Sequence, residues 1–400
     1  MNSSLRVRAL DQSLALVRSV AKDYGITRVT GTTALDRIGI PVFASIRPGA
    51  ARGSLCVSAG KGLVPEEAEM GAYMEAMELA LCEFGRSSLR YQAVTVNQML
   101  KTFNAPLTMA DFAPLIGQHF DEGETLACTI CEDTGTGSSV LVPSELVFSP
   151  FDENPFATKF GSSSVGLASG NSLLEASVHG LAELIEHDIA SFSFVNDESR
   201  LVILDSAPES IAALVRRCND AGFSLYLRYT PNVFGMPYFR ATLFDNTDEA
   251  PLAVCAGYGL HPVRSIAAVR AITEAAQSRL TAIHGGRDDL TKRLDHWTTD
   301  MRHEEVSAVA ALRAKESDAS DCISFAQIED NEEHITSLEA AWDFMIGALR
   351  SLRLTTVLRV GFTEASDNFQ VVKMIVPGLE AFAPEHMRIG TRFHDYILSL

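Results

Sequence analysis

Residues 171–188, with the sequence NSLLEASVHGLAELIEHD, combine the composition of a buried helix with a regular series of polar residues. These residues recur every three or four positions: Asn171, Glu175, His179, Glu183 and Glu186. At about 100° per residue, all five fall within an arc of about 120° on one helix face. Burying a carboxylate is costly unless something compensates its charge. A helix with this sequence must therefore either expose this face to solvent or place positive charge against it.

A solvated face is the simplest interpretation, but such faces normally mix Lys and Arg with Glu at i,i+4 spacing. No Lys or Arg occurs in residues 171–188, so ordinary salt-bridge decoration is disfavoured. A second predicted helix carries Glu75 and Glu78 three residues apart among Met, Ala and Leu, where a solvated edge remains an alternative. On a third predicted helix, Arg270 and Glu274 could simply pair with each other at i,i+4.

Carboxylates from more than one helix that face a common space repel one another unless they are protonated or bind cations. Oxygen-rich ligand sets without sulfur suit Mg²⁺, which in turn bridges carboxylates to phosphates. The segment SAGKGLVPEE places Lys61 between glycines shortly before a predicted helix N-terminus, where a phosphate can bind. A plain turn remains the alternative for this segment. The acids and Lys61 together predict a magnesium–nucleotide site.

Charge and length exclude several classes of protein. The chain has 400 residues, 46% of them hydrophobic, which is ample for a large core, and its net charge of −18 argues against binding nucleic acid. We find neither an apolar run of membrane-spanning length nor the apolar region of a secretory signal. Seven scattered cysteines then fit a reducing compartment. We expect a cytoplasmic protein without a membrane partner.

Familiar catalytic motifs are absent from the sequence. It contains no Walker A segment, no HExxH, no complete dinucleotide fingerprint and no nucleophile elbow. The only CxxC pair is Cys128 and Cys131, and a metal site would need further ligands. We therefore expect ordinary half-buried thiols there.

Hydrophobic periodicity predicts a mixed α/β (α+β) fold, with mixed sheets and packed helices. Helices are expected over 11–23, within 53–85, over 171–188, between 206 and 223, and over 263–285, and a small-residue loop over 161–171. Strands are expected within 26–48, 104–160, 201–206, 223–231, 238–245, 251–262, 355–362 and 369–379. Residues 285–335 read as a charged, partly exposed segment. The organisation is one domain over 1–400, or two intimately packed lobes.

These segments resemble the YcaO family, and the resemblance spreads over most of the chain. The most specific piece is GLASGNSLLEASVHGLAELIEHD, which fits the family's small-residue loop, a glutamate, and an ExxE pair followed by a final acid. The second is GKG around Lys61 followed by the ExxE pair of Glu75 and Glu78. The resemblance implies a YcaO-type ATP-binding fold and an enzyme that uses ATP and Mg²⁺.

Members of this family activate a peptide backbone amide by phosphorylating its carbonyl oxygen. A side-chain nucleophile then gives an azoline, and sulfide gives a thioamide. By resemblance, the metal ligands are Glu75, Glu78, Glu175, Glu183 and Glu186. The positions that match nucleotide contacts are Arg6, Ser13, Lys61, Asn171, His187 and Arg279. No catalytic residue is assigned.

Three positions depart from the family pattern. His187 stands where arginine is usual, and a neutral histidine lacks the fixed positive fork of a guanidinium group. Gly71 replaces a common serine before the first acid pair, and His179 replaces a common glutamine.

The resemblance also bears on subclass. Azoline-forming members commonly end in a proline-rich tail, whereas the last 15 residues, HMRIGTRFHDYILSL, contain no proline. We therefore expect a stand-alone YcaO protein that forms thioamides in ribosomally synthesised peptides or proteins. Its expected partners are the peptide substrate, a TfuA-like protein and a second copy in a homodimer. The alternatives are an azoline-forming cyclodehydratase and a non-catalytic nucleotide-binding adaptor for a TfuA-like partner. A metal hydrolase is disfavoured because no His-rich ligand set accompanies the acids.

Overall fold

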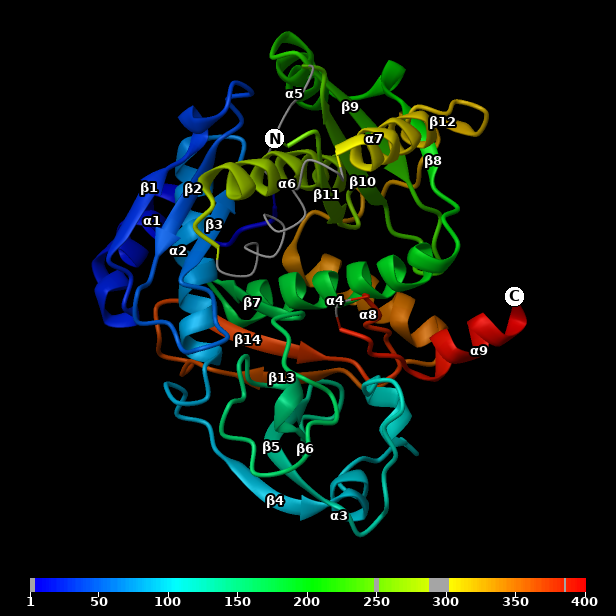
Figure 1. Ribbon diagram of the computed structural model, residues 1–400. Helices are drawn as coiled ribbons and strands as arrows, with labels where there is room; N and C mark the ends of the chain where they lie inside the picture. Colours follow the sequence, from blue (N-terminus) through cyan, green and yellow to red (C-terminus); the bar gives the residue numbers. More distant parts are fainter. Residues whose placement is uncertain (1–3, 248–251, 288–301, 385) are drawn as a thin grey trace. The chain divides into compact units, whose positions relative to one another are not determined.

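A computed structural model describes residues 4–247, 252–287, 302–384 and 386–400 (Figure 1). The chain divides into two compact units. Unit 1 comprises residues 1–50, 55–76 and 198–336, and unit 2 comprises residues 51–54, 77–197 and 337–400. Among the described residues, unit 1 contains two β-sheets and unit 2 contains one.

Unit 1 is built on a five-stranded sheet with the order β11-β10-β9-β8-β12. Its strands are β8 (Arg200–Ile203), β9 (Phe223–Tyr229), β10 (Tyr238–Asp245), β11 (Val254–Leu260) and β12 (Cys322–Ser324). Neighbours are antiparallel except β8 and β12, which run parallel. Successive side chains of a strand point to opposite faces. Phe239, Ala241 and Leu243 of β10 accordingly all enter the apolar core.

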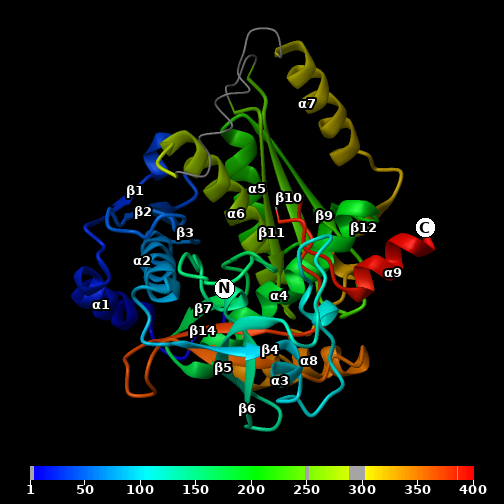
Figure 2. The ribbon, with the colours of Figure 1, turned by 60° about the horizontal axis from the view of Figure 1, so that its bottom comes forward.

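Two helices cover this apolar face, α5 (Glu209–Asp220) and α6 (Arg264–His284). A Cβ atom on Gly257 of β11 would lie 2.2 Å from the Ala275 backbone nitrogen of α6, so only glycine permits this close approach. The other face meets α7 (Arg302–Glu316), where the Glu316 carboxylate accepts hydrogen bonds from Arg240 and Thr242 of β10. Figure 2 shows α5 and α6 on one side of these strands and α7 on the other.

Unit 1 also contains a three-stranded antiparallel sheet, β1-β2-β3, beside its N-terminal helices. These elements are α1 (Leu10–Val20), β1 (Arg28–Gly31), β2 (Val42–Ile46), β3 (Val57–Lys61) and the first part of α2 (Pro65–Cys82). Gly60 explains how closely β3 meets α2. A Cβ atom there would lie 2.1 Å from the Ala68 carbonyl oxygen and 2.1 Å from the Ala72 nitrogen.

Unit 2 is built on a six-stranded antiparallel sheet with the order β4-β5-β13-β14-β7, and β6 pairs with β5. Its strands are β4 (Tyr91–Thr95), β5 (Thr125–Asp133), β6 (Ser139–Pro143), β7 (Leu167–Gly170), β13 (Leu358–Gly361) and β14 (Gln370–Ile375). Its helices are α3 (Val96–Leu100), α4 (Leu173–Val195), α8 (Leu338–Ser351) and α9 (Thr391–Ser399). Helix α4 packs on β7 and β14 and against α8 (Figure 1).

The predicted fold class is confirmed, and so is the order of most elements. The predicted helices 11–23, 171–188 and 263–285 correspond to α1 with a 3-10 turn, to α4 and to α6. The loop expected over 161–171 was wrong in part, because residues 167–170 form β7 and pair with β14. Small residues allow this buried strand to lie against α4, and the same residues made it read as a loop.

Much of the segment expected to be charged and exposed is ordered. Residues 302–316 of the predicted segment 285–335 form α7, and residues 322–324 form β12. Residues 288–301 lie outside the described part of the chain. The expectation of one domain or two lobes stays a prediction.

Candidate functional site

Helix α4 begins directly after β7, and its first turn brings two predicted site residues together. The Ser172 hydroxyl accepts a hydrogen bond from the Glu175 backbone nitrogen at 3.1 Å and so caps the helix. The Asn171 side-chain amide donates to both carboxylate oxygens of Glu175, at 3.0 and 3.3 Å. The Glu175 side chain is fully buried. A neutral amide therefore orients a buried carboxylate at the start of the helix.

The remaining members of the predicted stripe follow along α4. His179 is half-buried, and its Nδ1 atom lies 3.2 Å from the Ser169 carbonyl oxygen on β7. Glu183, Glu186 and His187 are also half-buried. We call Asn171, Glu175, His179, Glu183 and Glu186 the acid stripe. Apart from the buried Glu175, its members are half-buried, which fits neither a fully solvated face nor an interior face.

A buried lysine that sequence reasoning missed lies near this stripe. Lys373 of β14 is 3% exposed and donates a hydrogen bond to the Ser163 carbonyl oxygen. Burial lowers its pKa to about 8, against the opposing charges of Cys82 and Glu183. The Glu183 carboxylate on α4 thus interacts electrostatically with the ammonium group of Lys373 on β14. Only strand pairing in the sheet could reveal this partner.

In unit 1, several polar side chains gather at the edge of β3. The Ala59 backbone nitrogen donates to the Glu75 carboxylate at 2.9 Å, and the Gln277 side-chain amide donates to the Ala59 carbonyl oxygen at 2.6 Å. The Lys61 ammonium pairs with the Glu274 carboxylate at 2.5 Å. Side chains from α2 and α6 therefore hydrogen-bond backbone groups at the edge of β3 that, within the described part of the chain, are not paired with another strand.

The carboxylates at this edge have pKa values shifted in opposite directions. Burial raises the pKa of Glu75, although the Ala59 N–H and the charges of Arg287 and Lys61 oppose it. Burial also raises the pKa of Glu274, but the Lys61 ammonium, the Tyr258 N–H and Arg270 together outweigh burial. The pKa of Glu274 is therefore held below its usual value. The sequence left Glu274 as a possible i,i+4 partner of Arg270, and it could not assign the Lys61 partner on β3.

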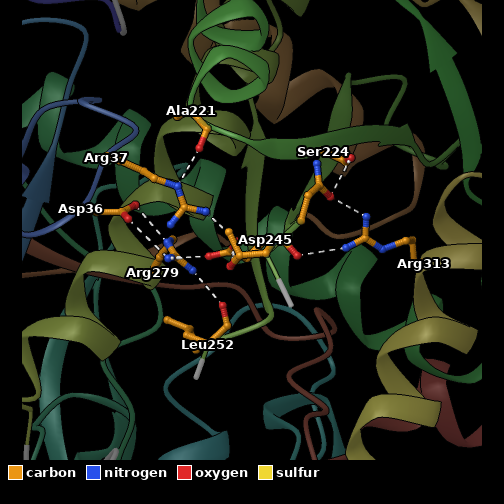
Figure 3. Close-up of polar contacts among 10 residues, drawn as sticks. Asp36, Arg37, Ala221, Ser224, Asp245, Leu252, Arg279 and Arg313 are labelled. Carbon is orange, nitrogen blue, oxygen red and sulfur yellow. Dashed lines mark hydrogen bonds and ion pairs between the residues drawn. The ribbon is translucent and has the colours of Figure 1, made fainter. Parts of the chain in front are cut away.

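Arg279, predicted to contact phosphate, is almost fully buried in unit 1. Its guanidinium donates to Asp36 at 2.9 and 3.3 Å, to Asp245 at 3.0 Å and to the Leu252 carbonyl oxygen at 2.8 Å (Figure 3). It also lies 4.6 Å from the centre of the Phe223 ring. These contacts give Arg279 a structural role, and a phosphate contact for it stays a prediction.

The other predicted positions are distributed over both units. Arg6 is exposed, and Ser13 is buried on α1. Glu78 is half-buried on the part of α2 that belongs to unit 2. Their assignments stay predictions.

The CxxC pair carries no sign of metal or redox chemistry. Cys128 and Cys131 are buried free thiols on β5, and burial raises the pKa of each to about 12. The thiolate is the reactive form, so these cysteines are inert at neutral pH.

The donor chemistry of the acid stripe fits Mg²⁺ with a phosphate ligand. Within the residues that the structure describes, no group of three or more His, Cys, Asp or Glu side chains converges as a protein-only cage. Mg²⁺ is usually held by one or two carboxylates together with substrate phosphates and water, so it needs no such cage. The oxygen donors of Glu175, Glu183 and Glu186 suit this role.

Comparison with known proteins identifies the class. The family model "YcaO cyclodehydratase, ATP- and Mg²⁺-binding" matches residues 59–380. A protein described as "in tfuA 3'region" from Rhizobium leguminosarum bv. trifolii is 32% identical over 393 residues, covering 95% of this chain and 90% of the relative. A protein from Methanothermobacter thermautotrophicus is 33% identical over 383 residues, covering 93% and 94%. The chain therefore belongs to the YcaO family, whose cofactors are ATP and Mg²⁺.

Solved structures show the same fold. YcaO from Methanopyrus kandleri, bound with AMPPCP and Mg²⁺, has a TM-score of 0.74 at 20% identity and covers 97% of this chain and 96% of its own. A heterocyclase in complex with substrate and cofactor has a TM-score of 0.73 at 18% identity and covers 94% and 53%. At this identity the likeness establishes the fold. Among the described helices, none has the length and apolar character needed to cross a membrane.

Proposed function

We propose that this chain is an ATP- and Mg²⁺-dependent enzyme that converts a backbone amide of a ribosomally synthesised peptide or protein into a thioamide. The acid stripe on α4 is the observation that carries the proposal, because it presents oxygen ligands suited to Mg²⁺ and phosphate from an otherwise apolar helix. The relative described by its place in the tfuA 3' region supports a TfuA-like partner. Its name fits the thioamide-forming subclass that the sequence suggested.

Each predicted residue except Arg279, whose guanidinium is held by Asp36 and Asp245, has a role in this proposal. Glu75, Glu78, Glu175, Glu183 and Glu186 hold Mg²⁺. Arg6, Ser13, Lys61, Asn171 and His187 contact ATP. The hydrogen bond from Asn171 to Glu175 supports a shared role for these two at the start of α4. The Lys61–Glu274 pair supports a lysine that is held in place before it meets a phosphate.

The proposed chemistry exchanges oxygen for sulfur at the amide carbon. The amide oxygen attacks the γ-phosphorus of ATP and ADP departs. Sulfide then adds to the carbon, the carbon–oxygen bond breaks, and phosphate leaves with the original oxygen. The protein contributes positioning and charge neutralisation, which dominate catalysis of phosphoryl transfer.

Azoline formation is the second candidate. The matched family model is described as a cyclodehydratase, and a heterocyclase shares the fold. In that reaction a Cys, Ser or Thr side chain of the substrate replaces sulfide as the nucleophile. A nucleotide-binding adaptor is the third candidate, favoured by His187 in place of the usual arginine.

The test is a reconstituted reaction with a TfuA-like protein, a candidate precursor peptide, ATP, Mg²⁺ and sulfide, followed by mass spectrometry of the peptide. We expect the mass gain of an oxygen-to-sulfur exchange. Loss of one water would instead support azoline formation. ATP binding without peptide-stimulated phosphate release would support the adaptor and contradict both enzymatic functions.

A charge-neutral variant tests the site assignment in the same assay. Glu183→Gln combined with Glu186→Gln keeps the side-chain shapes and removes both charges. Peptide-dependent phosphate release should fall about a hundredfold or more, since even residues that only orient metal ligands are worth ten- to a hundredfold. The matched control combines Glu332→Gln with Glu333→Gln, two exposed acids of unit 1, and should leave the rate unchanged. An unchanged rate in the Glu183 and Glu186 variant would refute the assignment.

A further inference from the structure

In unit 2, the chain after β14 returns to the far end of α4 and is held there by a buried aspartate. The Glu380 backbone nitrogen donates to Oδ1 of Asp188 at 2.8 Å. The Arg392 guanidinium donates to Oδ1 and Oδ2 of the same carboxylate at 2.5 and 3.3 Å. Asp188 is 1% exposed. One carboxylate of α4 therefore binds both a backbone group and a side chain of the returning segment.

The side chain of Glu380 connects the same segment to the first turn of α9, which carries Arg392. Its two carboxylate oxygens accept hydrogen bonds from the backbone nitrogens of Gly390 at 2.6 Å and Phe393 at 2.9 Å, which caps the first turn of α9. Arg392, in that same turn, reaches back to Asp188 and to the Gly378 carbonyl oxygen at 3.0 Å. We call Asp188, Glu380 and Arg392 the latch.

Contacts next to the latch extend it along the last two turns of α4. The Phe192 ring meets those of Phe393 and Tyr396 of α9, with centroids 5.6 and 5.2 Å apart. The Phe382 backbone nitrogen donates to the Ser191 hydroxyl at 2.9 Å. The end of α4 is thus fixed to the returning segment by polar and aromatic contacts together.

Apolar packing is not the only contact that holds the returning segment around residues 380–388. A cavity of about 50 Å³ lies beneath it, lined by Leu184 of α4, Lys373 of β14, and Glu380 and Arg388 of the segment. The segment has fewer packing partners on the side of this partly open pocket, and the polar contacts of the latch contribute to holding it.

The latch acts on the side of α4 that lies away from the metal-ligand candidates. At about 100° per residue, Asp188 stands about 200° from Glu186 and about 140° from Glu183 around the helix. A two-pronged guanidinium–carboxylate contact fixes orientation as well as distance. An anchor in this place sets the rotation of α4 and hence the direction in which Glu183 and Glu186 point.

We propose that Asp188, Glu380 and Arg392 are positioning residues that fix the rotation of α4 so that the acid stripe can hold Mg²⁺ and ATP. This inference rests on the proposed assignment of Glu183 and Glu186 as metal ligands. A buried ion pair often adds little stability compared with apolar packing, so orientation is the better reason for its presence here.

The test compares Arg392→Gln, Arg392→Lys and Glu380→Gln with a control of similar burial, Thr129→Val. Thr129 shares a buried hydroxyl contact with Ser144 at 2.8 Å, and its strand, β5, is separated from β14 by β13 in the sheet. Two quantities are measured on folded protein: the Mg²⁺ concentration that half-saturates ATP binding, and hydrogen exchange of the backbone amides of residues 181–188.

Arg392→Gln should raise the half-saturating Mg²⁺ concentration about tenfold, as expected for a residue that orients a metal ligand. Arg392→Lys should reverse part of that increase. Glu380→Gln should give a smaller increase, and it provides the test if Arg392→Gln does not fold. Thr129→Val should lower the melting temperature without changing either quantity. Latch variants that match Thr129→Val in both quantities would overturn the proposal.

The two proposals fail in different ways. If wild-type ATP binding does not depend on Mg²⁺, the metal-ligand assignment fails and the Mg²⁺-positioning role fails with it. Faster exchange at residues 181–188 would then still show that the latch holds α4. If wild-type binding depends on Mg²⁺ but the latch variants keep the wild-type midpoint, only the positioning role is overturned.

Discussion

Two groups of acidic side chains, Asp36 with Asp245 in unit 1 and the acid stripe in unit 2, are compensated differently. In unit 1, the Asp36 and Asp245 carboxylates pair with the guanidinium groups of Arg37 and Arg279, so acids and guanidinium groups balance (Figure 3). In unit 2, the acid stripe contains no Lys or Arg, and Glu175 is oriented by a neutral amide. The first arrangement pairs carboxylates with guanidinium groups and stabilises a fold. The second has the ligand chemistry that a cation and a nucleotide require.

Within unit 1, two carboxylates have pKa values shifted in opposite directions. Burial raises the pKa of Asp245, but hydrogen bonds from Thr247 and Arg37 and the charge of Arg279 outweigh it, and the pKa is held below its usual value. At Glu75 of the candidate site, burial dominates and the pKa is raised. Burial therefore makes the charged form of Glu75 less favourable, whereas the partners of Asp245 keep its charged form favourable.

The largest effect expected from this comparison is at Arg279. Arg279→Met leaves Asp36 and Asp245 buried beside less positive charge, which should lower the free energy of unfolding by about 3–5 kcal/mol. Denaturant unfolding measures this change. ATP affinity of the folded variant should stay within about twofold of wild type. A loss of affinity in Arg279→Lys, with stability largely kept, would instead support the phosphate contact predicted from the sequence.

Lys61 should behave in the opposite way. Its side chain is 22% exposed and its pair with Glu274 is partly solvated, so Lys61→Gln should change stability by less than about 1 kcal/mol. The KM of the Lys61→Gln enzyme for ATP should rise about tenfold, as expected for the loss of one charge-assisted hydrogen bond to phosphate. Steady-state kinetics against ATP concentration give this number. Lys101→Gln, an exposed lysine of unit 2, is the control, and an equal KM in both variants would exclude Lys61 from the site.

Acid unfolding should reveal the lowered pKa of Asp245. A carboxylate with a lowered pKa contributes stability above its usual pKa, about 3.9 for Asp, and this stability is lost as pH falls through the folded-state value. Asp245→Asn should therefore show a smaller loss of stability than wild type between pH 5 and pH 2. Asp220→Asn, at an exposed site on α5, is the control. Parallel stability curves for wild type and Asp245→Asn would contradict the lowered pKa.

The smallest effect is a gain at His187. His187→Arg restores the fixed positive fork that the family pattern contains, and ATP affinity should increase about three- to tenfold. Isothermal titration calorimetry is the measurement, with His394→Arg on the exposed face of α9 as control. A weaker affinity would mean that this chain has rearranged the contact around histidine.

The sequence predicted the local part of the site better than its long-range part. Asn171 and Glu175 are four residues apart, and the periodicity that predicted the helix placed both on the face where the structure has them in contact. The partners of Arg279 lie 243 and 34 residues away, and no local pattern reveals them. The interpretation of Arg279 as a phosphate ligand came from its place in a motif, without knowledge of Asp36 and Asp245.

Strand edges and close packing explain the other differences. The buried strand β7 read as a loop because its small residues serve contact with α4 rather than alternation of polar and apolar side chains. Lys61 and Glu274 were both noted in the sequence, yet their pairing depends on α6 lying beside β3. Sequence periodicity predicts elements, whereas such pairings require the arrangement of the sheets.

The central claim, that the acid stripe binds ATP through Mg²⁺, is tested most directly by calorimetry of ATP binding. Wild-type protein is titrated with ATP in Mg²⁺ and in excess chelator, and Glu183→Gln with Glu186→Gln is treated in the same way. We predict that chelation and the double substitution each weaken binding by about a hundredfold, and that together they add little, because both remove the same interaction. Equal affinity of wild type with and without Mg²⁺, or full affinity in the double variant, would contradict the account.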